Sequence, residues 1–271
     1  MTPPSVAIPP LLRGLVDDAA VFPPGNAALP DALSGHRAHR ASWFEDLVGP
    51  LLLPVGKLGA LSGADAPLRL GLIADSGPAA VGPAIAALPE GVVAHHVEAR
   101  AADAAALDAL AESANDWGLP TFAEIPVTDP APLLDRLADG GLTPKFRTGG
   151  LAPELFPGPE TLAAAIGGCV ERGLNFKLTA GLHHAVRHTD PSTGFVHHGF
   201  VNVLAATLAA DAGDGIETVT DMLATTESAP LLDRVRDALP LRRPAWVGFG
   251  SCSITEPLDD LIDLSLVRKE N

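Results

Sequence analysis

The fold is decided by one stretch of the sequence, GLTPKFRTGGLAPELFPGPETLAAAIGGCVERGLNFKLTAG, which runs from Gly141 to Gly181. It predicts a strand at residues 144–148, a helix at 159–172 that ends before Gly173, and a second strand at 175–179. Two parallel strands need a crossover connection between them, and a helix of this length supplies one. The stretch therefore predicts a parallel α/β unit.

The same alternation extends in both directions along the chain. Further strands are predicted at residues 14–21, 49–55, 68–74, 92–98, 121–126 and 246–250, and helical patterns at 30–47, 78–88, 101–117, 130–138 and from about 199 to 238. A short segment at residues 57–62 follows the strand predicted at 49–55. Thr255 is expected to cap a last helix, with Pro257 near its start. Eight strands, each followed by helical pattern, favour a single-domain α/β fold, a (β/α)8 TIM barrel over residues 1–271.

Composition narrows the class of function. The net charge of −15 argues against nucleic acid as a partner, and no apolar run reaches the roughly 18 residues of a membrane span. The N-terminal residues show no signal-peptide pattern. Two cysteines give neither a disulfide framework nor a CxxC metal site. We therefore expect a cytoplasmic protein that binds neither nucleic acid nor membrane, and a homo-oligomer is compatible with the sequence.

Three cations are predicted to point into the barrel. In residues 175–179 the phenylalanine and the leucine share one face and Lys177 lies on the other, and in residues 144–148 the phenylalanine faces away from Lys145 and Arg147. If the apolar side chains face the helices, the cations line the interior on neighbouring strands. The chain uses arginine far more often than lysine, so a lysine kept here favours a task that needs a deprotonatable amine. The alternative is a lysine that reaches from a strand end to water.

Short motifs in the same region resemble a known family. The segments KFRTGG (145–150), KLTAG (177–181) and GFGS (248–251), with a helix opening near residues 160–161, resemble the strand 6, 7 and 8 pattern of deoxyribose-phosphate aldolase-like class I aldolases. The resemblance covers about the last 40% of the chain. It implies a TIM-barrel lyase in which Lys145, spaced from Thr148 and Gly149 as in the family, forms a Schiff base.

The resemblance also implies roles for other residues and shows two departures. Lys177 would lower the pKa of the nucleophile, and the turn at Gly250 and Ser251 would bind phosphate. Arg147 is an added cation, and His183 and His184 lie where the family continues its phosphate site. Deoxyribose phosphate is therefore not the expected substrate.

Carboxylates near predicted strand ends are candidates for proton transfer. Glu98 and Glu124 lie within apolar strands, where burial would raise their pKa, and are the preferred general acid/base. Asp17 or Asp18 is expected to hold a substrate hydroxyl or to lock its loop, with Asp18 taken as the binding residue. Asp75 is a further candidate. For each of them an exposed or structural carboxylate is the alternative.

The long polar segment at residues 181–199 is expected to cover the mouth of the barrel. Its His183, His184 and His198 are predicted to bind substrate or transfer protons, as Thr148 and Thr179 are predicted to contact substrate. A metal site that combines these histidines with Glu98 is the weaker alternative, because no HxH or HExxH spacing is present. We expect neither metal nor cofactor.

Three further residues receive simpler predictions. His96 is expected to point inward, in phase with Glu98. Cys252 has no assignable histidine partner and is interpreted as a packing residue, and Cys169 as a core residue.

Three functions fit these patterns. The first is a Schiff-base-forming lyase of the aldolase type that acts on a small anionic carbonyl metabolite, phosphorylated or carboxylated. The second is an isomerase, decarboxylase or metal-assisted hydrolase in which the lysines act as electrostatic clamps. The third is a non-catalytic barrel that binds a small anion.

Overall fold

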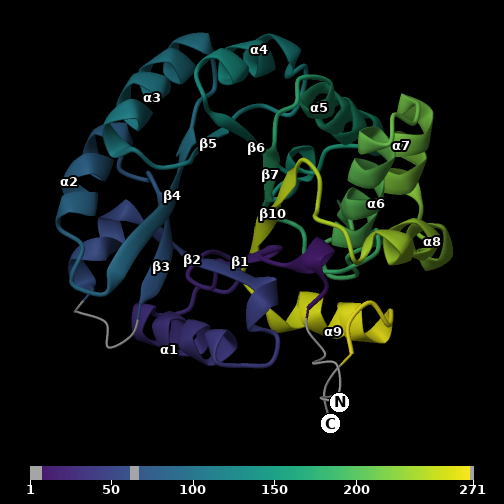
Figure 1. Ribbon diagram of the computed structural model, residues 1–271, viewed down its shortest axis with the longest axis horizontal. Helices are drawn as coiled ribbons and strands as arrows, with labels where there is room; N and C mark the ends of the chain where they lie inside the picture. The colour runs from purple at the N-terminus through teal and green to yellow at the C-terminus, as the bar shows by residue number, and fades with distance from the viewer. Residues whose placement is uncertain (1–7, 62–66, 269–271) are drawn as a thin grey trace.

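Eight parallel strands close into a barrel in the computed structural model of the protein, which describes residues 8–61 and 67–268. Around the barrel the strands follow the order β1-β10-β7-β6-β5-β4-β3-β2 (Figure 1). Their bounds are β1 (Val16–Asp18), β2 (Val48–Pro54), β3 (Leu68–Ile73), β4 (Val92–Arg100), β5 (Thr121–Glu124), β6 (Thr143–Arg147), β7 (Phe176–Thr179) and β10 (Trp246–Ser251). The predicted (β/α)8 TIM barrel is confirmed.

Helices surround the barrel on its outside (Figure 1). They are α1 (Leu29–Arg40), α2 (Val81–Ala86), α3 (Ala104–Trp117), α4 (Ala131–Asp139), α5 (Pro159–Glu171), α6 (Phe200–Asp211), α7 (Ile216–Ala224), α8 (Ser228–Ala238) and α9 (Thr255–Asp263). Short 3-10 turns are η1 (Pro10–Leu12), η2 (Glu45–Leu47), η3 (Val55–Ala60), η4 (Pro78–Ala80) and η5 (Pro153–Leu155). Among the described residues, no helix combines the length and the apolar character needed to cross a membrane.

The apolar faces of the strands pack against the helices. Phe146 of β6 and Phe176 and Leu178 of β7 are fully buried and share one core cluster with Leu162 of α5 and Phe200 of α6. Burying such a side chain contributes about 1.5–3 kcal/mol. Because side chains alternate along a strand, this packing turns the lysines of β6 and β7 toward the barrel interior.

Two predicted helix boundaries differ from the structure. The helix predicted at 30–47 ends at Arg40, whose guanidinium donates to the backbone oxygens of Glu45 (2.6 Å) and Val48 (2.9 Å) and holds the turn that follows. Thr255 does not cap α9 but is its first residue; the Ser253 Oγ accepts the Glu256 N–H instead.

The segment at 181–199 also differs from the irregular loop that was predicted. It contains a small antiparallel pair, β8 (His188–Thr189) and β9 (Val196–His197). Residues 1–7, on which part of the prediction of no signal peptide rests, and Ser62, the end of the 57–62 segment, lie outside the described residues.

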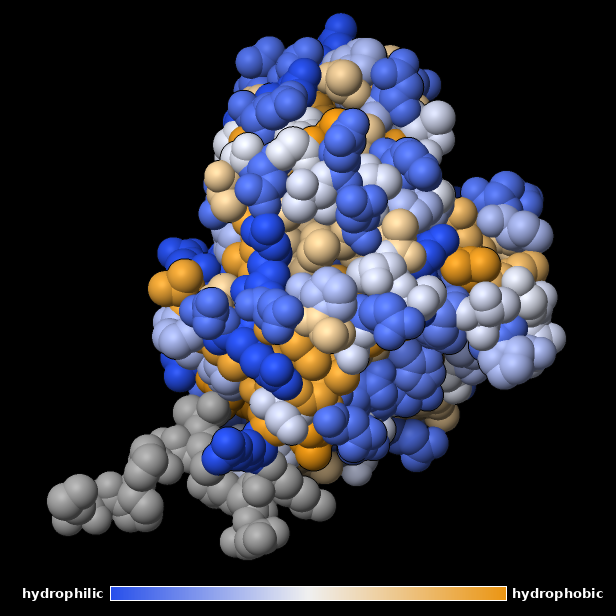
Figure 2. Space-filling view, turned by 90° about the vertical axis from the view of Figure 1, so that its right-hand side faces the viewer, coloured by the Kyte–Doolittle hydropathy of each residue, from blue (hydrophilic) through white to orange (hydrophobic). Residues whose placement is uncertain are grey.

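The outer face that carries α7 and α8 is hydrophilic over most of its area, with apolar residues gathered in a smaller region (Figure 2). This matches the acidic composition of the chain, whose net charge is −15. The charged groups that matter for chemistry lie elsewhere, inside the barrel.

Candidate active site

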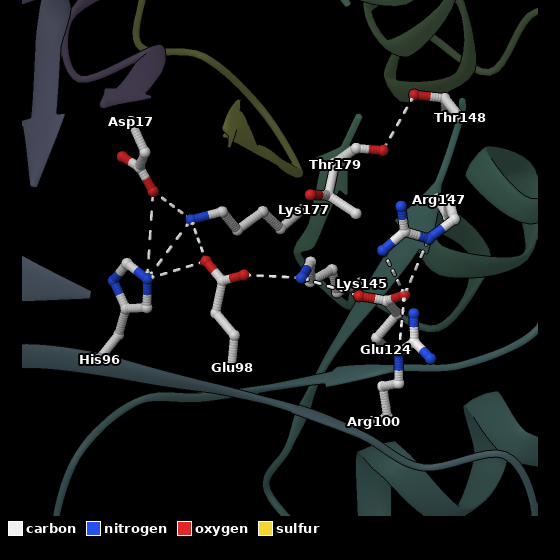
Figure 3. Close-up of polar contacts among 10 residues, drawn as sticks. All are labelled: Asp17, His96, Glu98, Arg100, Glu124, Lys145, Arg147, Thr148, Lys177 and Thr179. Carbon is white, nitrogen blue, oxygen red and sulfur yellow. Dashed lines mark hydrogen bonds and ion pairs between the residues drawn. The ribbon is translucent and has the colours of Figure 1, made fainter. Parts of the chain in front are cut away.

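Two buried lysines meet one carboxylate inside the barrel. Lys145 of β6 and Lys177 of β7 are direct neighbours in the strand register and are 5% and 1% exposed. The Lys145 Nζ lies 2.7 Å from Glu98 Oε2, and the Lys177 Nζ lies 2.7 Å from Glu98 Oε1. Glu98, from β4, therefore bridges the two amines (Figure 3).

On one side the cluster continues toward solvent. The Lys145 Nζ lies 2.9 Å from Glu124 Oε2, and the other oxygen of Glu124 accepts a hydrogen bond of 3.1 Å from the Arg147 Nε. The exposed fraction of the side chains rises from 6% at Lys145 to 12% at Glu124 and 31% at Arg147. Exposure therefore increases along the cluster from Lys145 toward Arg147.

On the other side the cluster is closed. The Lys177 Nζ donates to Asp17 Oδ2 and lies 3.4 Å from His96 Nε2 (Figure 3). It also lies 5.1 Å from the centre of the Phe122 ring, a cation–π contact. Carboxylates, an imidazole and an aromatic ring therefore surround Lys177, and its side chain is only 2% exposed.

His96 has polar contacts at both ring nitrogens. Its Nδ1 lies 2.9 Å from His95 Nδ1, and its Nε2 lies 3.0 Å from Glu98 Oε1. Burial lowers the pKa of His95 to about 4, so that ring is neutral at pH 7. These contacts hold the His96 ring between His95 and Glu98.

Two glycines make room for these side chains. A Cβ at Gly49 of β2 would overlap the Asp17 carboxylate, and a Cβ at Gly71 of β3 would overlap the His96 ring. Larger residues at these positions would push both groups out of the interior. The interior face of β2 and β3 is thus shaped to hold the charged cluster.

Opposite charges are paired throughout the cluster. Three carboxylates (Asp17, Glu98 and Glu124) contact Lys145, Lys177 and Arg147, and the largely exposed Arg100 also lies 3.7 Å from Glu124. Burial favours the neutral form of each group, but the opposite charges nearby outweigh it. Consequently the pKa of Glu98, facing Lys145 and Lys177, is well below its ordinary value, and that of Glu124 is also lowered, by Lys145 and Arg147.

The same balance acts on Lys177. Burial opposes its charge, but Asp17 and Glu98 outweigh burial and raise its pKa above the ordinary value. The expectation that burial raises the pKa of Glu98 and Glu124 is therefore wrong in direction. A carboxylate also lies between the two amines, so Lys145 does not face an uncompensated cation at Lys177.

The structure also places three potential metal ligands together. Asp17, His96 and Glu98 each offer a ligand atom, and these atoms lie within 4.8 Å of one another. The Lys177 ammonium group contacts all three residues and supplies the positive charge that balances the two carboxylates.

Asp18 lies outside the cluster, and its prediction as a substrate-binding residue is corrected. Its carboxylate faces α1, where it lies 3.1 Å from His36 Nδ1 and 3.5 Å from His39 Nδ1. Burial would raise the pKa of Asp18, but the hydrogen bonds from the two histidines lower it to about 2. The neighbouring Asp17 points inward in its place.

Thr148 has a structural contact where a substrate contact was predicted. It is fully buried, and its hydroxyl donates to the Ala180 oxygen at 2.6 Å, which links the ends of β6 and β7. Gly149 lies so close to Gly181 that a Cβ would come within 2.7 Å of the Gly181 Cα. Thr179 is partly buried at the end of β7, on the same strand face as Lys177.

The three predicted histidines do not join the lysine cluster. His183 Nδ1 lies 2.9 Å from Glu256, His184 Nδ1 lies 3.3 Å from Asp260, and the buried His198 donates from Nε2 to the Pro157 oxygen at 2.8 Å. Burial lowers the pKa of His198 to about 4, so it is neutral at pH 7. A metal site built from these residues and Glu98 is not assembled among the described residues.

Gly250 pairs with Asp17 of β1 and with Thr179 of β7 in the strand register, so its backbone lies beside the cluster. Ser251 is buried, and its Oγ accepts the Ser253 N–H at 3.2 Å. The first turn of α9 carries Glu256, whose carboxylate disfavours a phosphate at this helix end. Asp75 accepts the Gly56 N–H at 3.1 Å, on the surface.

The sequence left Asp17 and Asp18 as alternatives, with Asp18 taken as the binding residue, and it predicted an inward His96 without a role. One signal was available: Val16 and Asp18 share a face, and an apolar Val16 that packs against helices leaves Asp17 pointing inward. His96 was placed in phase with Glu98, but its contact with Lys177 depends on a strand 81 residues away.

The comparisons with known proteins add little at the level of sequence. No family model matches the chain, and no curated protein matches it. Among solved structures, the chain is similar to "a putative fructose-1,6-biphosphate aldolase from Coccidioides immitis", with 14% identity and a TM-score of 0.30 over 87% of this chain and 97% of that one. A likeness at this level bears on neither fold nor activity, which rest on the geometry of this chain.

Proposed function

We propose that the protein is a Schiff-base-forming lyase of the aldolase type, acting on a small anionic carbonyl metabolite, phosphorylated or carboxylated. One observation carries the proposal: the amine of Lys145 lies between the carboxylates of Glu98 (2.7 Å) and Glu124 (2.9 Å) at the more exposed end of the buried cluster. An amine nucleophile thus has two proton acceptors in direct contact.

The residues present can perform each step of this chemistry. The Lys145 amine adds to the carbonyl carbon to give a carbinolamine, with its ammonium proton passing to Glu98 or Glu124. The same carboxyl group then protonates the departing hydroxyl, water leaves, and an iminium ion forms. Cleavage of the carbon–carbon bond sends its electron pair into the iminium, while a carboxylate accepts the hydroxyl proton of the leaving aldehyde. Hydrolysis of the resulting enamine returns the free amine.

Either carboxylate can carry the proton, because the Lys145 Nζ lies 2.7 Å from Glu98 Oε2 and 2.9 Å from Glu124 Oε2. The two ammonium groups lower the pKa of Glu98 well below its ordinary value, and Lys145 and Arg147 also lower the pKa of Glu124. Both groups are therefore carboxylates at neutral pH, the form that accepts a proton.

The surroundings of the two lysines favour Lys145 over Lys177 as the nucleophile. Asp17 and Glu98 hold Lys177 in its charged form, which cannot attack a carbonyl. Its role in the proposal is to fix the Glu98 carboxylate beside Lys145. Arg147, which is 31% exposed, would hold the carboxylate or phosphate of the substrate.

Reduction with borohydride tests the proposal. The protein is incubated with a panel of small phosphorylated and carboxylated aldehydes and ketones, reduced, and analysed by peptide mass spectrometry. We expect an adduct on Lys145 that is lost in Lys145→Met and retained in Lys57→Met, because Lys57 is exposed and far along the chain from the cluster. Absence of any adduct across the panel would refute the Schiff base.

A metal-assisted hydrolase is the second candidate, favoured by the convergence of Asp17, His96 and Glu98 within 4.8 Å. It requires a metal ion to displace the Lys177 ammonium group. Metal analysis of the purified protein separates the two: stoichiometric zinc or manganese, with activity lost on chelation, supports the hydrolase. Metal-free protein that forms the Lys145 adduct supports the lyase.

A further inference from the structure

A second group of reactive side chains lies outside the lysine cluster. Cys252 directly follows β10, His183 lies in the segment after β7, and Glu256 belongs to the first turn of α9. Cys252 was expected to be a packing residue because no histidine could be assigned to it. The structure supplies that histidine.

The three side chains are arranged in series. The His183 Nε2 lies 4.0 Å from the Cys252 Sγ, and the His183 Nδ1 lies 2.9 Å from Glu256 Oε2. One ring nitrogen thus faces a thiol and the other faces a carboxylate. This is the order of nucleophile, base and orienting acid found in enzymes that transfer acyl groups through a covalent intermediate.

The charge at this group favours a reactive thiol. The contact with Cys252 and that with Glu256 raise the pKa of His183 to about 9, against the effect of burial. An imidazolium beside a thiol stabilises the thiolate, which is the nucleophilic form. Cys252 is partly exposed, whereas Cys169 is buried in α5 and burial raises its pKa to about 12.

Backbone donors are also available next to the thiol. Within residues 8–61 and 67–268, the N–H groups of Cys252 and Ile254 donate to no protein acceptor. Ile254 directly precedes Thr255, the first residue of α9, and Cys252 lies two residues before Ile254. In acyl-transfer enzymes the N–H of the nucleophile itself helps to hold the oxyanion.

We propose that Cys252 is the nucleophile of a second site that accepts a small acyl group from an ester or thioester, with His183 as the base and Glu256 orienting His183. The Sγ–carbon bond forms, the bond from the carbonyl carbon to the leaving oxygen or sulfur breaks, and the leaving group departs with its electron pair and takes a proton from His183. Water then attacks the acyl-cysteine and releases the carboxylic acid and the free thiol.

The test uses p-nitrophenyl acetate as the acyl donor and full-length protein. We expect a burst of about one nitrophenolate per chain and an acetyl group on the Cys252 peptide. The burst is lost in Cys252→Ser, slowed at least about tenfold in His183→Gln and a few-fold in Glu256→Gln. His184→Gln is the matched control, because His184 contacts Asp260 of the same helix without facing a cysteine.

Alkylation by iodoacetamide needs no variant and guards against misfolding. In the wild-type chain we expect Cys252 to be alkylated, because it is partly exposed, and Cys169 to be protected, because it is buried. Cys169 serves as the internal reference and should stay unlabelled in the folded protein.

Two results would overturn the proposal. One is an acetylation rate at Cys252 that is the same in wild type, His183→Gln and His184→Gln. The other is a reactive Cys252 that is alkylated but never acetylated. Borohydride trapping at Lys145 is measured on the same samples, so that failure of this site and failure of the proposed lyase are distinguished.

Discussion

Ionisable side chains cluster in the barrel interior and at a second place, the rim, which we define as Cys252, His183 and Glu256 next to the start of α9. The two clusters differ in burial and in how their charges are paired. In the interior, Glu98 is 1% exposed and bridges two ammonium groups, so each charge depends on the others. At the rim, His183 and Glu256 form a single pair with side chains 21% and 48% exposed. Buried charges are costly to leave unpaired, whereas solvent screens exposed ones. The interior therefore positions groups rigidly, and the rim can titrate without loss of the fold.

The largest loss of stability is expected from Glu98→Gln. The change leaves two buried ammonium groups without their shared counter-ion, which should cost about 3–5 kcal/mol of unfolding free energy. Urea unfolding measures it. Glu124→Gln is the matched control, because Glu124 is more exposed and the Lys145 amine still contacts Glu98 in that variant. An equal loss in both variants would show that the bridging position of Glu98 adds no unfolding free energy.

An intermediate loss is expected from Asp18→Asn. The folded-state pKa of Asp18 is about 2, compared with an ordinary value of 3.8, and this difference corresponds to about 2 kcal/mol. Because its folded pKa is lowered, this contribution is fully present above pH 3.8 and is lost as the pH falls through about 2. Stability measured across that window should converge for wild type and variant at the acid end. Parallel curves would contradict the assignment of Asp18 to the histidines of α1.

The smallest loss is expected from His183→Gln at the rim. The raised pKa of His183, about 9 compared with 6.5, gives stability that is fully present below pH 6.5 and is lost as the pH rises through about 9. Since the pair is partly exposed, the loss at neutral pH should stay below about 1 kcal/mol. Thermal unfolding between pH 6 and 10 provides the measurement. A loss comparable to that of Glu98→Gln would remove the distinction between the two regions.

The alternation of side chains along a strand predicts which way each side chain points, because that direction depends only on neighbours in the same strand. It predicts that Lys145, Arg147 and Lys177 point inward, since their apolar neighbours face the helices. The same rule selects Asp17 over Asp18 in β1, because Val16 and Asp18 share the face that packs outward. The eight-stranded barrel was predictable for a similar reason. Strand and helix patterns are local, and eight successive strand–helix units favour a sheet that closes into a barrel.

Contacts between distant elements could not be predicted from one sequence. The acceptor of the Thr148 hydroxyl is Ala180, and the partner of His183 is Glu256, 73 residues away. The pKa direction of Glu98 was wrong for the same reason. Burial could be inferred from an apolar strand, whereas the two ammonium groups that outweigh it are known only once β4, β6 and β7 are placed in the barrel.

Borohydride trapping of the protein with a small anionic aldehyde or keto acid bears most directly on the role of Lys145. We expect one reduced adduct per chain, on Lys145, in the wild-type protein. In Lys177→Met, which removes the partner that fixes Glu98, we expect the adduct to form more slowly and still on Lys145. An adduct on Lys177, or trapping that continues undiminished in Lys145→Met, would show that the nucleophile is another group.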